Sequence, residues 1–189
     1  MPTKLQLDLA MAKTLLHRSR DIDRQIQLEE RCFGLSVEAS QGVPKDAGTI
    51  IEGVIRVMER KDKLIVLKNK IEQIVARFPA GLEQIARSCF FNGQKPNVVA
   101  LKLGVTPSAV YQQLQRATKL FASRMGRMGI DKEMFKHLVK LYPWMGLDLV
   151  YRLRRSSAPT RQHDCKRKET QEVNQTDDEG GNVSQRRCA

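Results

Sequence analysis

Apolar side chains in the first 78 residues recur mostly at steps of three and four, the spacing of one face of an α-helix. The first stripe consists of Leu9, Ala12, Leu15 or Leu16, Ser19, Ile22, Ile26 and Phe33. Gly34 follows its last member directly. The pattern predicts one long helix that begins near residue 3 and ends at Gly34.

A second stripe predicts another long helix after a loop from Ser36 to Gly48. Thr49 is expected to cap its N-terminus, and Glu52, three residues later, to complete a capping box. Pro79 ends the pattern. The stripe is made of Ile50, Val54, Val57, Leu64, Leu67, Ile71, Ile74 and Phe78, with Lys61 at its one missing position.

The two helices predict an antiparallel hairpin over residues 1–79, about 40 Å long at a rise of 1.5 Å per residue. A hairpin of this length cannot bury both stripes completely. We therefore expect it to form a homodimer through a coiled-coil-like contact or to dock on another partner. The alternative is a hairpin that serves only as a spacer.

Residues 80–130 carry the signals of two short helices joined by a tight turn. Pro96 suits the first position of a helix, and Gly104 suits a helix end that needs a positive φ. Thr106 can cap the next helix, with Pro107 as its first residue. Ala100, Gly104 and Val110 have the relative offsets zero, four and ten of a helix-turn-helix, which needs a small contact, a tight turn and an inward branched residue.

If Val110, Leu114, Ala117 and Phe121 point inward, a rotation of 100° per residue turns a polar face outward. Glutamine amides on this face match adenine, and arginine matches guanine or a phosphate. The candidates for contact with DNA bases are Ser108, Tyr111, Gln112, Gln115 and Arg116. The candidates for contact with DNA phosphates, near helix N-termini or bearing positive charge, are Lys95, Asn97, Lys102, Thr106, Lys119 and Arg124.

Charge separates this segment from an ordinary helical hairpin inside a core. The chain of 189 residues has a net charge of +12, and no acidic residue lies between Glu83 and Asp131. Seven arginines and lysines fall within that window. Such a surface releases counterions from a phosphate backbone, although a solvated basic face is the plain alternative.

The remaining segments predict less. Residues 131–155 have apolar positions at helical steps and predict one or two short helices packed on the domain. Residues 156–189 carry six basic and six acidic side chains and few apolar ones, so we expect a disordered tail. The predicted fold class is all-α, with the hairpin at 1–79, the helix-turn-helix at 80–130, short helices at 131–155 and the tail.

Several function classes lack support in the sequence. There is no Gly-rich phosphate loop, no G-x-S-x-G motif and no useful carboxylate pair, so we expect no enzymatic activity. The four cysteines and three histidines form no close ligand pairs, so we expect neither a metal nor a cofactor. No apolar run reaches about 18 residues, and we expect a cytoplasmic protein without membrane contact.

Residues 96–121 resemble region 4 of bacterial RNA-polymerase sigma factors, above all from Val110 to Leu120. A longer stretch, about 10–128, is similar to the ArpU-type sigma-like regulators of phage and mobile elements in Gram-positive bacteria. The resemblance implies a transcription regulator that binds double-stranded DNA and contacts RNA polymerase. Two departures bear on the polymerase contact: this chain has Pro96-Asn97 where the family usually has acidic residues, and Phe90-Phe91 where an Arg-Tyr pair is common.

A phage DNA-packaging or architectural protein is the main alternative. Small subunits of phage terminases also combine a helix-turn-helix with helices for oligomerisation. They usually carry the DNA-binding motif first, whereas the predicted hairpin comes first here.

Overall fold

The computed structural model describes residues 3–40 and 47–157. Every regular element in these residues is helical, as the predicted all-α class requires. Residues 41–46 of the predicted loop and residues 158–189 of the predicted tail, with His163, Cys165 and Cys188, lie outside the described residues. Among those described, no helix combines the length and the apolar character needed to cross a bilayer.

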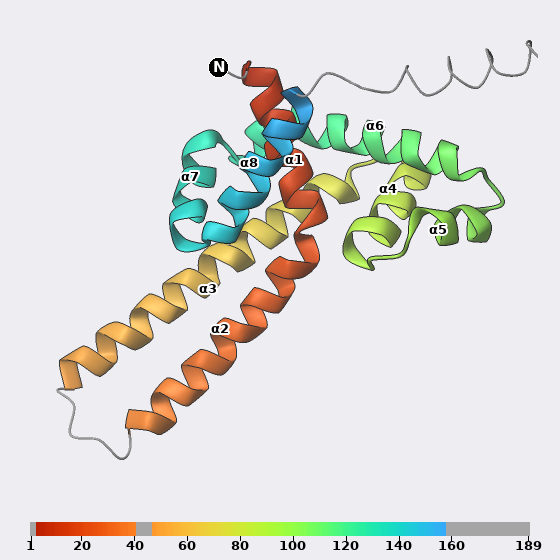
Figure 1. Ribbon diagram of the computed structural model, residues 1–189. Helices are drawn as coiled ribbons and strands as arrows, with labels where there is room; N and C mark the ends of the chain where they lie inside the picture. The colour runs from red at the N-terminus through yellow and green to blue at the C-terminus, as the bar shows by residue number, and fades with distance from the viewer. Residues whose placement is uncertain (1–2, 41–46, 158–189) are drawn as a thin grey trace, which may run out of the picture. The chain divides into compact units, whose positions relative to one another are not determined.

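Figure 1 shows the helices of the described residues. In chain order they are α1 (Lys4–His17), α2 (Ser19–Ser40), α3 (Ala47–Ala76), α4 (Ala80–Ala86), the π-helical turn η1 (Arg87–Phe91), α5 (Pro96–Leu103), α6 (Pro107–Met125), the 3-10 turn η2 (Gly126–Met128), α7 (Lys132–Leu141) and α8 (Pro143–Ser157). Where one or two short helices are predicted, over residues 131–155, the structure has two, α7 and α8.

The helices α2 and α3 lie antiparallel, as the two stripes predict (Figure 1). Ion pairs across them follow the antiparallel order: Lys61 reaches Glu30 at 2.8 Å, and Lys68 reaches Asp23 at 2.6 Å. Burial of the second stripe is complete in its C-terminal half, at Leu64, Leu67, Ile71, Ile74 and Phe78, and partial in its N-terminal half.

Three predictions for the two long helices are wrong. The first helix is interrupted at Arg18, because the Ser19 hydroxyl bonds to Leu16 O at 3.0 Å and to Phe90 O at 2.8 Å, across the fold. Gly34 does not end the helix, which continues to Ser40. A single glycine costs only about 1 kcal/mol relative to alanine.

The predicted capping box is the third error. The helix α3 begins at Ala47, so Thr49 lies inside its first turn. Glu52 pairs with Arg56, one turn further along, at 2.9 Å. The Glu52 carboxylate, which the sequence pattern assigns to the helix cap, therefore pairs with a residue four positions later in the same helix.

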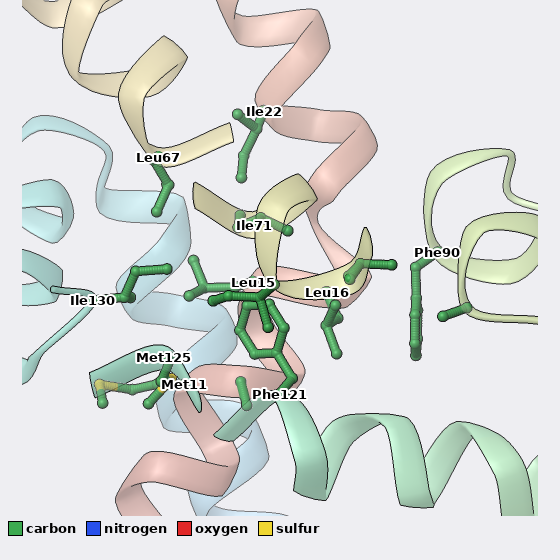
Figure 2. Close-up of a cluster of buried hydrophobic side chains, with 14 of the residues drawn as sticks. Met11, Leu15, Leu16, Ile22, Leu67, Ile71, Phe90, Phe121, Met125 and Ile130 are labelled. Atoms are coloured by element: carbon green, nitrogen blue, oxygen red, sulfur yellow. The ribbon is translucent and has the colours of Figure 1, made fainter. Parts of the chain in front are cut away.

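One hydrophobic cluster joins the hairpin to the rest of the described chain (Figure 2). Figure 2 shows Met11, Leu15 and Leu16 of α1 packed with Ile71 of α3 and Phe121 of α6. The predicted boundary between residues 79 and 80 passes through this cluster. Residues 1–79 and 80–130 therefore complete a common core, and α1 lies against α6.

A buried carboxylate ties α8 to the interruption between α1 and α2. Asp148 accepts hydrogen bonds from Arg18, at 3.1 Å, and from Arg152 one turn away. Burial alone would raise the pKa of Asp148, but the bonds from the two guanidinium groups outweigh it and lower the pKa. The ionised carboxylate thus fixes the point where α1 meets α2.

Candidate nucleic-acid interface

The turn between α5 and α6 has the local geometry that its sequence predicts. Pro96 begins α5, and Gly104 ends it in the left-handed conformation, with φ at 65°. The amide of Val105 bonds to Ala100 O at 3.0 Å, which closes the helix end. The Thr106 side chain then accepts a hydrogen bond from the Ala109 amide at 3.2 Å, and Pro107 begins α6.

A small core of its own holds the two helices together. Val99, Ala100 and Val110 are buried there with Ile85 of α4. Ala100 is 1% exposed, so a larger side chain at this position would push α5 away from α6. The second half of α6 points Ala117 and Phe121 into the large cluster. Two separate cores therefore fix the rotation of α6 about its axis.

This rotation turns the predicted base-contacting side chains outward. Tyr111 is 52% exposed. The other four candidates, Ser108, Gln112, Gln115 and Arg116, are exposed as well. They share one face of α6 because their positions follow helical steps, and this face lies opposite the residues that enter the two cores.

The predicted phosphate-contacting side chains divide into two groups. Lys95, Asn97, Lys102, Thr106 and Lys119 are exposed on α5, on α6 or at their N-termini. Arg124 is directed elsewhere: its guanidinium donates to Arg77 O at 2.8 Å and lies 5.8 Å from the centre of the Phe78 ring. Arg124 thus holds α6 against the end of α3, and its guanidinium points away from the polar face of α6.

Two residues that the sequence pattern does not predict lie next to the candidate interface, because the tertiary structure brings α1 against α6. A groove of about 530 Å³ runs between α1, η1 and α6. Lys13 and His17 of α1 line one wall, while Tyr111, Gln115 and Lys119 of α6 line another. No acidic side chain lines this groove within the described residues. Lys13 therefore extends the basic surface to an element about 100 residues earlier in the chain.

His17 lines this groove beside Phe90. Its ring stands edge-on to the Phe90 ring, with the centroids 4.9 Å apart, while its other side remains open to water. Burial against Phe90, and then the positive charge of Arg152, lower the pKa of His17 to about 4. The imidazole is therefore neutral near pH 7, and the positive charge of the groove comes from its lysines.

No family model, curated protein or solved structure matches this chain in comparisons with known proteins. The geometry of α5 and α6 is consequently the basis for assigning a function.

Proposed function

We propose that the protein is a sequence-selective regulator of transcription that binds double-stranded DNA through α6. The observation that carries the proposal is the exposed polar face of α6, which two cores hold in a fixed rotation. An α-helix fits the major groove, where side chains near its N-terminus reach the base edges. Tyr111, Gln112 and Gln115 lie within the first turns of α6.

Phosphate contacts would hold the helix in register. The N-termini of α5 and α6 are the positive ends of their helix dipoles, and the exposed Lys95, Lys102 and Lys119 lie on or next to these helices. Lys13 stands on the far wall of the groove, where it would meet the same DNA strand. Such contacts position the protein, whereas the glutamines would select the sequence. The resemblance to sigma region 4 adds RNA polymerase as a candidate second partner.

Selection of bound duplexes from a random library, with the full chain, tests this function. We expect enrichment of one motif, and a sequence like a −35 promoter element would favour a sigma-like role. A palindrome would favour an ordinary dimeric repressor. Binding without an enriched motif would contradict sequence selectivity and favour the packaging or architectural alternative.

A triple variant identifies the binding face. Lys95→Gln, Lys102→Gln and Lys119→Gln together should weaken duplex binding in fluorescence anisotropy, to a similar extent on selected and random DNA. The matched control has Lys4→Gln, Lys132→Gln and Lys140→Gln, which remove the same charge from exposed positions on α1 and α7. Equal losses in both variants would show that net charge alone drives binding and would overturn the assignment to α6.

A further inference from the structure

A second row of apolar side chains runs along α3, beside the stripe that packs against α2, and its Met58 and Asp62 border a small cavity with Glu30 and Phe33 of α2. Its members lie at steps of four, three, four and four, so they share one helical face. They are Ile51, Ile55, Met58, Asp62 and Val66. The four apolar members are between 48% and 57% exposed, whereas Leu64 and Leu67 of the inner stripe are fully buried.

The row ends in a groove that other elements complete. Val66 of α3 forms one wall of a groove of about 600 Å³ together with the charged Glu59, Asp62 and Lys63. The other wall consists of Met134, His137 and Leu138 of α7. Figure 1 shows α7 alongside the middle of α3, while the N-terminal part of α3 extends beyond it. An exposed apolar segment and an open apolar groove thus lie on the same face, one after the other.

Charged residues beside the row have an order that suits antiparallel pairing of two identical helices. Glu52, Arg56, Glu59 and Lys63 follow one another along this flank. In an antiparallel pair with a two-fold axis between residues 57 and 58, residue 52 faces residue 63 and residue 56 faces residue 59. Each acidic side chain then meets a basic one, four times in the dimer.

We propose that a second copy of this chain binds here, with the two α3 helices antiparallel about that axis. Such a contact is isologous, because the same patch serves both copies. Ile51 of one copy then lies level with residue 64 of the other, about 3 Å along the helix axis from its Val66, so the exposed segment of each helix runs towards the groove of its partner. The segment from 51 to 64, which pairs with itself about this axis, is roughly 20 Å long at 1.5 Å per residue.

The one charged member of the row is compatible with this register. Asp62 of one copy lies level with Gly53 of the other. Because glycine has no side chain, this register brings no second charge opposite the Asp62 carboxylate. In the described part of the chain, no ion pair involves Glu59 or Lys63, whereas Glu52 and Arg56 pair with each other at 2.9 Å within one helix. The second copy would extend this exposed pair into a network across the two helices.

Sedimentation equilibrium of the full chain without DNA tests the proposal. At micromolar concentration we expect a mass twice that of the chain. Ile55→Lys places a charge at the centre of the interface and should raise the dissociation constant at least about tenfold. The matched control Leu147→Lys changes an apolar residue of α8 that is 74% exposed, and should leave the dimer intact. A monomeric wild type, or an undiminished dimer with Ile55→Lys, would overturn the proposal.

A charge exchange tests the register. Arg56→Glu alone places like charges opposite each other in the homodimer, and so does Glu59→Arg alone. Both homodimers should weaken several-fold. Mixed together, the two variants should form a heterodimer in native mass spectrometry, because every facing pair is again of opposite charge. Homodimers of unchanged strength, or no preference for the heterodimer, would exclude this antiparallel register.

The α3 interface is independent of the proposed DNA binding. The measurements contain no DNA, and the variants lie on α3, away from α6. A monomeric Ile55→Lys variant that still binds duplex DNA would support both proposals. A dimer that does not bind duplex DNA would support the α3 interface and contradict only the proposed DNA-binding function.

Discussion

The outward faces of α3 and α6 differ in the kind of surface they present. Both helices bury an apolar stripe in the same large cluster. Opposite that stripe, α6 presents amides, a phenol, a hydroxyl and positive charges, without an acidic residue. By contrast, α3 presents isoleucine, methionine and valine beside charges of alternating sign. The first face suits a polyanion with hydrogen-bonding edges, and the second suits apolar burial against a protein.

The difference shows that the buried stripe of a helix predicts its packing, while the opposite face indicates its partner. Binding at α6 should depend on counterion release and pairing at α3 on apolar area, so the two should respond to different perturbations. Because the core is shared, some changes should nevertheless affect both faces.

The largest expected effect comes from Phe121→Ala. Phe121 is fully buried where α1, α3 and α6 meet, and its truncation should lower the free energy of unfolding by about 3–5 kcal/mol. Chemical denaturation should show one transition, shifted as a whole. The control Leu147→Ala, at an exposed position, should change the stability by less than about 0.5 kcal/mol. Two separate transitions, only one of them shifted, would show that the hairpin and the helix-turn-helix fold independently.

The next largest effect should follow Gln112→Ala combined with Gln115→Ala. The preference for the selected site over random DNA should fall by about 1–3 kcal/mol for each glutamine that bonds to a base edge. The α3 dimer should remain unchanged. Gln113→Ala, half-buried on a neighbouring face of α6, is the matched control. An equal weakening on selected and random DNA would assign both glutamines to phosphates.

Salt concentration should affect DNA binding at α6 and pairing at α3 to different extents. If Lys13, Lys95, Lys102 and Lys119 each neutralise one phosphate, the logarithm of the DNA affinity falls with a slope of about −3.6. The affinity then drops roughly 12-fold for each doubling of salt. The affinity of the dimer should depend far less on salt, because exposed ion pairs contribute little to it and most of the affinity comes from its apolar centre. Titrations at several salt concentrations measure both, and equal slopes would contradict the distinction between the faces.

The last expected effect concerns His17, which lines the groove between α1, η1 and α6. Its pKa is about 4 in the fold and 6.5 when unperturbed, so the unfolded chain takes up a proton first as the pH falls. The contribution of the neutral ring to stability is therefore complete above pH 6.5 and is lost progressively towards pH 4. Denaturation curves across this range should be flatter for His17→Gln than for the wild type. Identical pH profiles would show that the ring is not held neutral.

Local features of the helix-turn-helix are predictable from sequence because each depends on residues close in the chain. Pro96, Gly104 and Thr106 restrict their own backbone or cap the next turn, and all three occupy the predicted positions. The side chains on α6 follow from the helical repeat once Val110 and Phe121 are placed inside. The base-contacting role of that face stays a prediction.

Features that depend on residues far apart in the chain are not predictable in the same way. The interruption at Arg18 requires the carbonyl of Phe90, and the place of Arg124 requires the carbonyl of Arg77. Nothing near Lys13 in the chain indicates that it shares a groove with Gln115.

The sequence by itself determined the all-α class, the antiparallel hairpin, the turn between α5 and α6, and the sign of the charge around them. Helical periodicity, capping and composition are properties of neighbouring residues, and they act before any tertiary contact forms. Only the tertiary structure decided that one core unites the hairpin with the helix-turn-helix, that Lys13 joins the basic groove, and that the apolar row of α3 continues into a groove with α7. These arrangements depend on which helices pack together, since side-chain packing brings residues distant in the chain within a few ångströms of each other.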